Sequence, residues 1–241
     1  MKTVGIIGGL GPETTAEFYL AVMFGCARIA KAHRPAILTW SVPLSYELEE
    51  AALVRGAHVE QILPILTDAA KRLQAGGADF LVMPCNTLHR FIEEIRASVD
   101  IPVLSVVEAV VKFLDARGVN DVGLIATAIT LESGFYQKAL SAANVQYSVP
   151  DEFQQAKLAK MIHGLVTNRY ANHLRQELIE VVEQLDQQGT RTILLACTDL
   201  QALVPHHPRM QIFDTMQILA DLTVSEMCEV DTEWHRTNSF S

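Results

Sequence analysis

Residues 73–87 read LQAGGADFLVMPCNT, and residues 185–199 read LDQQGTRTILLACTD. In each stretch a leucine closes a helix-like segment, a glycine follows four residues later, and an apolar run then ends at a cysteine. Matching positions keep a constant offset of 112 residues, from Leu73 and Leu185 to Cys85 and Cys197. This repeated order of helix, glycine, strand and cysteine predicts two related halves.

A weaker match links the starts of the two halves. Residues 4–7 (VGII) resemble residues 122–125 (VGLI), at an offset of 118 residues. Chance similarity between valine-rich strands is an equally good explanation of this match. Around both matches, apolar runs of strand length alternate with longer segments of helical periodicity, which is typical of parallel βαβ units. The sequence therefore predicts the α/β class, with ligand chemistry where the carboxyl ends of the strands meet.

The expected elements follow one another through most of the chain. Strands are expected at residues 3–9, 36–42, 80–84, 103–106, 121–127, 146–149 and 192–196, and helices at 12–31, 57–74, 88–97, 107–117, 131–143, 152–168, 173–188 and 216–229. We expect an N-terminal α/β domain at residues 1–100 and a C-terminal one at 101–230. In an alternative arrangement, the last helix of the second domain packs back on the first domain. Residues 231–241 are polar without periodicity, which predicts a disordered tail.

The composition excludes several classes of protein. With 241 residues, of which 49% are hydrophobic and 20% charged, the chain has enough apolar material for a large core. A net charge of −9 offers no basic surface to a nucleic acid. Its apolar runs fall far short of the roughly 20 residues that cross a membrane, and the N-terminus lacks a signal peptide's apolar region. We expect a cytoplasmic protein with no nucleic-acid or membrane partner, whose four cysteines are thiols.

Cys85 and Cys197 are the strongest candidates for chemistry. Each ends a buried strand and precedes side chains that can cap a helix, Asn86 and Thr87 in one case and Thr198 in the other. A helix N-terminus stabilises a thiolate, and its unpaired amides can hold a substrate carboxylate. Either cysteine alone could be a small core residue. Their equal positions in the two halves favour a functional pair.

Other motifs give weaker predictions. Gly5 to Thr15 matches neither the dinucleotide fingerprint nor the P-loop, so it predicts a tight turn near the site, or else a plain connection from strand to helix. There is no paired metal-ligand motif, and His89 is interpreted as a supporting residue. None of the lysines follows a strand as the two cysteines do, so no pyridoxal phosphate site is expected. Cys26 and Cys228 lie inside helical patterns and are expected in the core.

Four motifs occur in order: Gly8-Gly9-Leu10-Gly11-Pro12, Pro84-Cys85-Asn86-Thr87-x-His89, Ala126-Thr127-x-x-Thr130 and Ala196-Cys197-Thr198-Asp199. In these motifs the chain resembles the cofactor-independent aspartate/glutamate racemases of the Asp/Glu/hydantoin racemase superfamily. The resemblance implies two pseudo-symmetric α/β domains with the active site between them, a small amino-acid substrate, no metal or other cofactor, and a homodimer. It also implies that Cys85 and Cys197 are catalytic, and that the substrate is bound by Leu10, Gly11, Asn86, Thr87, Thr127 and Thr198.

The sequence departs from the family pattern where a second substrate carboxylate would bind. Leu48 stands where aspartate-specific members have an arginine, and Val166 stands near the place of a family lysine. The resemblance then implies a weaker preference for aspartate over neutral amino acids, because a buried carboxylate without a partner costs on the order of several kcal/mol. Arg55 and Arg169 are alternative sources of the missing charge.

The expected reaction follows from the paired thiols. Racemisation needs a base on one face of the Cα and an acid on the other, and two opposed cysteines supply both. Amides and hydroxyls around the carboxylate would stabilise the carbanion. Hydantoin racemisation, maleate isomerisation and decarboxylation of a malonate-like acid are alternatives on the same fold, although a decarboxylase would tend to keep only one thiol. A non-catalytic amino-acid-binding protein is the alternative from another class.

Overall fold

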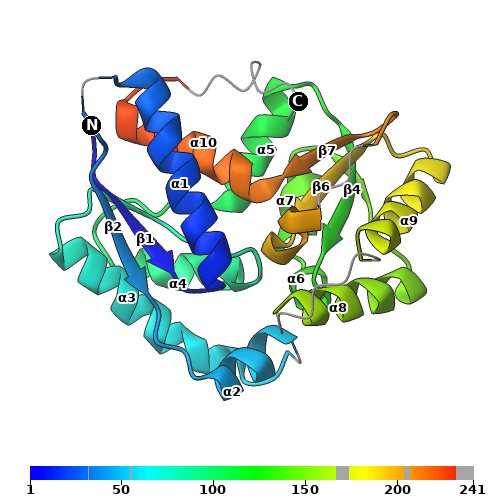
Figure 1. The fold of residues 1–241 in the computed structure, drawn as a ribbon, viewed down its shortest axis with the longest axis horizontal. Coiled ribbons are helices and arrows are strands. Elements are labelled where there is room, and N and C mark those ends of the chain that lie inside the picture. The colour runs from blue at the N-terminus through cyan, green and yellow to red at the C-terminus, as the bar shows by residue number, and fades with distance from the viewer. Residues whose placement is uncertain (32, 55, 167–173, 204–206, 232–241) are drawn as a thin grey trace.

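The computed structural model describes residues 1–31, 33–54, 56–166, 174–203 and 207–231. These residues form two parallel sheets, each flanked by helices (Figure 1). The first sheet has the strand order β2-β1-β3, and the second has the order β5-β4-β6-β7. The predicted α/β class with two related parallel-sheet units is confirmed. Of the tail predicted at 231–241, residues 232–241 lie outside the described residues.

The first sheet has β1 (Val4–Gly8) at its centre, between β2 (Ile37–Ser41) and β3 (Phe80–Val82). Its α-helices are α1 (Pro12–Ile29), α2 (Tyr46–Glu49), α3 (Leu63–Ala75) and α4 (Ile92–Ala97), joined by 3-10 helices at Val59–Ile62 and Thr87–Phe91 and a π-helical turn at Glu50–Val54. All of β1 is buried, with Val4 and Ile6 in a cluster that includes α1 side chains and Ile7 in another that includes α3 side chains. Burial on both faces explains why this strand is a continuous apolar run.

The second sheet repeats this arrangement with one more strand. Its strands are β4 (Asp121–Ala126), β5 (Gln146–Ser148), β6 (Thr192–Ala196) and β7 (Gln211–Asp214). Its helices are α5 (Val106–Ala116), α6 (Ala128–Ser133), α7 (Phe135–Ala142), α8 (Glu152–Val166), α9 (Leu174–Gln187) and α10 (Thr215–Cys228), and a 3-10 helix spans Thr198–Leu203. The buried strands β4 and β6 form the centre of the sheet.

Gly5 and Gly123 show that the repeat extends to side-chain packing. A Cβ atom on Gly5 would lie 2.6 Å from Cδ2 of Leu81, and one on Gly123 would lie 2.6 Å from Cδ1 of Ile193. Leu81 and Ile193 are themselves a matched pair in the sequence repeat. Both β1 and β4 therefore carry a glycine where the matched side chain of the adjacent strand packs closely across it. This agreement supports the weaker sequence match between the two strand starts.

The last helix, α10, packs against α1, and the two lie side by side in Figure 1. They approach so closely that a Cβ atom on Gly25 would lie 2.5 Å from Cγ2 of Val224. The amide of Lys2 also donates to the carbonyl of Met227 at 2.9 Å. Because α10 also packs against α5, one apolar cluster contains side chains from both sheets and from all three helices. Helix α10 is thus joined to the beginning of the chain.

Several predicted elements are wrong in detail. The strand expected at 103–106 is reduced to a single bridge between Leu81 and Val103, because Ser105 already caps α5 by accepting from the Glu108 amide. The helix expected at 131–143 is two helices that meet at Gly134, which has a left-handed φ of 70°. Strand β7 and the short α2 were not predicted, and the helix expected at 88–97 starts as a 3-10 helix.

Within the described parts of the chain, none of the helices is both long enough and apolar enough to cross a bilayer.

Candidate functional site

Cys85 lies in the turn between β3 and the 3-10 helix Thr87–Phe91. Its side chain is 5% exposed and belongs to an apolar cluster that also contains Leu10 and Leu88. The Cys85 amide donates to the carbonyl of Met83 at 2.8 Å, which closes a tight turn directly after the strand. The thiol is therefore held in a fixed, mostly apolar setting at the carboxyl edge of the first sheet.

Cys197 occupies the equivalent position on the second sheet. It follows β6 directly, is 3% exposed, and lies in an apolar cluster with Ile125 and Met161. Its carbonyl accepts a hydrogen bond from the Leu200 amide at 3.3 Å. A 3-10 helix, Thr198–Leu203, follows it, as another follows the first thiol. Both candidate thiols thus stand between the carboxyl end of a strand and a short helix, Cys197 directly and Cys85 with two residues before it and one after it.

Asn86 joins the two sheets. Its side chain makes no capping hydrogen bond to the helix that follows, so the predicted capping role is wrong. Its Oδ1 accepts from the Tyr136 hydroxyl at 2.6 Å, and its Nδ2 donates to Oγ1 of Thr215 at 3.1 Å. Tyr136 lies on α7 and Thr215 is the first residue of α10. The side-chain NH₂ group of Asn86 carries two hydrogens, and the hydrogen bond to Thr215 uses only one of them.

Three threonine hydroxyls meet between the carboxyl ends of β3 and β4. Oγ1 of Thr87 lies 3.3 Å from Oγ1 of Thr127 and 3.2 Å from Oγ1 of Thr130. Thr127 also caps α6 by accepting from the Thr130 amide at 3.1 Å. Two predicted substrate-binding residues, Thr87 and Thr127, are therefore brought together from different sheets. Thr198, a third, is half-buried beside Cys197.

Leu10 and Gly11 end the glycine loop, directly before α1. Leu10 is buried in the same apolar cluster as the first thiol. The Thr15 hydroxyl accepts from the Gly9 amide at 2.9 Å and donates to the Gly11 carbonyl at 2.9 Å, so it fastens the loop to the helix. A Cβ atom on Gly9 would lie 2.9 Å from the backbone nitrogen of Val42. The loop is thus a tight turn that requires glycine where it passes the end of β2.

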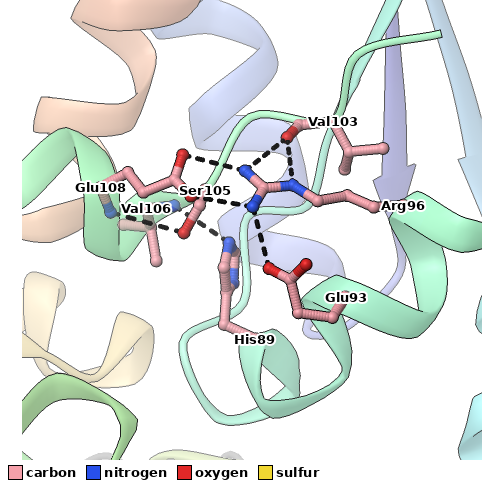
Figure 2. A network of polar contacts seen from close by, with 7 residues as sticks. All are labelled: His89, Glu93, Arg96, Val103, Ser105, Val106 and Glu108. Atoms are coloured by element: carbon pink, nitrogen blue, oxygen red, sulfur yellow. Dashed lines mark hydrogen bonds and ion pairs between the residues drawn. The ribbon is translucent and has the colours of Figure 1, made fainter. Parts of the chain in front are cut away.

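His89 supports the turn that carries Cys85. The Val106 amide donates to Nε2 of His89 at 3.0 Å (Figure 2), so the ring proton is on Nδ1, which donates to the Cys85 carbonyl at 2.7 Å. Burial is the main cause that lowers the pKa of His89 to about 4; the hydrogen bond to Cys85 opposes the shift, and the Arg96 charge adds to it. His89 is therefore neutral near pH 7, with both nitrogens engaged.

Arg96 extends this support to the start of α5. Figure 2 shows its guanidinium between Glu108, to which it donates at 2.8 and 2.9 Å, and the Val103 carbonyl, to which it donates at 3.1 and 3.2 Å. Glu93 accepts a further hydrogen bond at 2.9 Å. The two-pronged pairing of Arg96 with Glu108 fixes both groups in orientation. The segment after the first thiol is thereby anchored to the segment that leads into the second sheet.

The structure describes only some of the residues expected where a second substrate carboxylate would bind. Leu48 lies on α2 and is partly buried against the apolar cluster that contains Leu10 and Cys85. Val166 is the last residue of α8. Arg55 and Arg169, the alternative sources of positive charge, lie outside the described residues.

Sequence reasoning missed Tyr136 and Thr215. Tyr136 stands in a helical pattern where an aromatic residue is usually a core residue, and the sequence carries no sign that its hydroxyl reaches Asn86. Thr215 follows β7, which was itself not predicted. The sequence Asp214-Thr215 before an apolar run is a helix-start signal, and Asp214 does cap α10 by accepting from the Met216 amide at 2.8 Å.

Among the described side chains, no three or more His, Cys, Asp or Glu residues are grouped so that they could hold a metal ion. All four cysteines lie in the described part of the chain and are thiols. Burial is the main cause that raises the pKa of Cys26 to about 12, with the nearby Cys228 adding to the shift. Cys26 is thus a protonated core thiol, as its place in α1 predicts.

Comparison with known proteins gives consistent matches over nearly the whole chain. The family model "Asp/Glu/Hydantoin racemase" matches residues 7–223. The chain is 28% identical to the "Broad specificity amino-acid racemase RacX" of Bacillus subtilis (strain 168), over 92% of this chain and 96% of that one.

Comparison with solved structures leads to the same family. An aspartate racemase of Picrophilus torridus is 25% identical with a TM-score of 0.77, covering 98% of each chain. An aspartate racemase homologue of Pyrococcus horikoshii OT3 has the same identity and TM-score, covering 95% of this chain and all of that one. Because the family model covers most of the sequence, this chain belongs to the Asp/Glu/hydantoin racemase family, whose named relatives here are racemases and hence isomerases.

Proposed function

We propose that this protein is an amino-acid racemase in which Cys85 and Cys197 exchange the Cα proton of the substrate. The observation that carries the proposal is the equivalent position of the two thiols, each at the carboxyl end of a buried strand in one of two matched sheets. A thiolate on one face removes the proton while the thiol on the other face delivers one, and the roles reverse for the other enantiomer. The reaction needs neither pyridoxal phosphate nor a metal in this scheme.

The hydrogen-bond donors beside the thiols are suited to the substrate's carboxylate. Thr87 and Thr127 bring hydroxyls from both sheets to one place, and Thr198 adds another next to the second thiol. We assign carboxylate and amino-group binding to these residues together with Asn86, while Leu10 and Gly11 line the same site. Donors fixed before the substrate arrives stabilise the negative charge that develops as the proton leaves.

The side-chain specificity is proposed to be broad rather than restricted to aspartate. Leu48 is packed against the apolar cluster of Leu10 and Cys85, where a charged carboxylate would lose water without gaining a partner. The Bacillus subtilis relative is named as a broad-specificity racemase, which agrees with this proposal. Neutral amino acids are therefore expected among the substrates, with a weaker preference for aspartate.

We further propose that the protein acts in the cytoplasm and that a domain boundary lies near residue 100. We also propose that it is a homodimer, as the resemblance to the family implies. The sister reactions of hydantoin racemisation, maleate isomerisation and decarboxylation remain the alternatives on this fold. A non-catalytic binding protein is the alternative from another class.

The test is a racemisation assay over a panel of L-amino acids, with the products separated by chiral chromatography. A racemase converts at least one of them to its D-enantiomer, and alkylation of the thiols abolishes this activity while bound substrate protects against it. Absence of conversion for the whole panel, with intact folding, would contradict the proposal.

A further inference from the structure

A buried chain of side-chain hydrogen bonds runs between the two strand ends that carry the candidate thiols. Tyr136, Asn86 and Thr215 are each at most 2% exposed. The Tyr136 hydroxyl lies 2.6 Å from Asn86 Oδ1, Asn86 Nδ2 lies 3.1 Å from Thr215 Oγ1, and Thr215 Oγ1 lies 2.9 Å from the Leu195 carbonyl oxygen. Asn86 follows Cys85 directly, and Leu195 lies two residues before Cys197 on β6.

The carbonyl of Leu195 fixes which group donates and which accepts in each of these hydrogen bonds. A carbonyl only accepts, so the single hydroxyl hydrogen of Thr215 goes to Leu195, and Thr215 must then accept from Asn86. The amide nitrogen of Asn86 therefore faces Thr215, and its oxygen faces Tyr136, which donates. Thr215 Oγ1 also lies 3.2 Å from Asn86 Oδ1, but a bond there would take the hydrogen from the shorter contact with Leu195.

The donor at the start of this chain stays protonated. Burial is the main cause that raises the pKa of Tyr136, and the nearby charge of Asp214 adds to it, although the Thr215 hydroxyl opposes the shift. Because its pKa is raised, Tyr136 is a neutral phenol near pH 7 and can donate its hydroxyl hydrogen to Asn86. The orientation of the Asn86 amide is fixed as a result, including the direction of its second hydrogen.

We propose that Tyr136 and Thr215 are positioning residues that hold the Asn86 amide, and with it the strand end of Cys85, in register with the strand end of Cys197. This inference rests on the proposed function, because it concerns the geometry of the two-thiol reaction. Proton transfer by two thiols that follow strands of separate sheets depends steeply on their relative placement. Loss of the hydrogen bonds that hold Asn86 should therefore slow the chemical step more than it weakens substrate binding. Neither residue touches the substrate in this scheme.

Thr215 offers a matched control on the same helix. Thr215 and Thr223 are both fully buried residues of α10, and each hydroxyl donates to a backbone carbonyl, Leu195 at 2.9 Å and Leu219 at 2.7 Å. Thr215→Val and Thr223→Val therefore remove the same group from comparable surroundings, and only one of them lies in the chain of hydrogen bonds. Thr215→Ser keeps the hydroxyl and removes only a methyl group.

The experiment measures kcat and KM in both directions for the purified full-length variants, with the folded fraction checked by thermal unfolding. Thr215→Val and Tyr136→Phe are expected to lower kcat about ten-fold in each direction, with KM changed by less than about two-fold. Thr223→Val and Thr215→Ser are expected to keep kcat within about two-fold of the wild type, even where Tm falls.

The outcomes separate this inference from the proposed function. Wild-type racemisation that depends on Cys85 and Cys197, together with unimpaired kcat in Thr215→Val and Tyr136→Phe, would overturn the positioning role alone. Equal losses in Thr215→Val and Thr223→Val would also overturn it, since a general packing effect would then explain both. A wild-type protein that racemises nothing would contradict the proposed function, and the inference would fall with it.

Discussion

Thr87 and Thr127 place their hydroxyl oxygens 3.3 Å apart, although one residue follows β3 of the first sheet and the other follows β4 of the second. Asn86 and Thr215 make a second hydrogen bond across the same junction, at 3.1 Å. The carboxyl ends of the two sheets thus face one another through polar side chains. Polar groups in such a position are satisfied by one another without substrate and can donate to a carboxylate when one binds.

Racemisation is expected to be independent of added cofactors. Activity should be unchanged after dialysis against EDTA and after treatment with a reagent that removes pyridoxal phosphate, because two thiols supply both proton-transfer groups. The measurement is the initial rate of D-enantiomer formation before and after each treatment. Recovery of activity only on adding pyridoxal phosphate or a divalent metal would contradict the mechanism.

Leu48→Arg should shift specificity toward aspartate. A guanidinium beside the apolar cluster of Leu10 and Cys85 would give the substrate's second carboxylate a partner, and the ratio of kcat/KM for aspartate to that for a neutral amino acid is expected to rise about ten-fold or more. The assay compares aspartate with alanine and methionine as substrates.

Two variants control for charge and for shape at this site. Tyr46→Arg adds the same charge on α2 at a side chain that is 89% exposed, and Leu48→Met changes shape without adding charge. Both should leave the specificity ratio near that of the wild type. A wild-type enzyme strictly specific for aspartate would show that another cation already binds the second carboxylate.

His89 should make folding stability depend on pH in acid. Its pKa is lowered to about 4 in the folded state, against 6.5 for an exposed histidine, so between these values the unfolded chain binds a proton that the folded chain does not. The free energy of unfolding therefore holds its full value above about pH 6.5 and falls as the pH drops toward 4, by at most about 3 kcal/mol.

The check is a series of urea unfolding curves between pH 4 and 8 for the wild type and His89→Gln. The difference in unfolding free energy between the two should be largest near pH 7 and shrink in acid, because only the wild type carries the titrating imidazole. His207→Gln, outside this network, serves as the control variant. A difference that does not change with pH would mean that His89 is not the titrating group.

The sequence predicted the parts of the molecule that follow from local pattern. The matched Leu-Gly-strand-Cys stretches predicted that both thiols follow strand ends, because a buried parallel strand is a continuous apolar run and the cysteine comes directly after that run in the sequence. Strand β7 could not be predicted, because its four residues, Gln211–Asp214, are only partly buried and too short for a clear period.

Contacts between distant side chains were beyond sequence reasoning. The capping prediction for Asn86 was reasonable from residue type, since asparagine is a favoured N-cap. It failed because Tyr136 and Thr215, both far away in the chain, offer the amide better partners once the two sheets are assembled. No local sequence pattern indicates that the hydroxyls of Tyr136 on α7 and Thr215 on α10 reach Asn86 in the turn after β3.

The direct test of the two-thiol mechanism is solvent exchange in deuterated water with single thiol variants. Cys85→Ser and Cys197→Ser should each lose racemisation, because a serine hydroxyl without an adjacent base ionises far less readily than a thiol. Each should still exchange the Cα hydrogen of one enantiomer, and the enantiomer should differ between the two variants. Cys26→Ser and Cys228→Ser, in α1 and α10, should racemise in both directions in the wild-type ratio. Near wild-type racemisation by either strand-end variant, or exchange of the same enantiomer by both, would contradict the account.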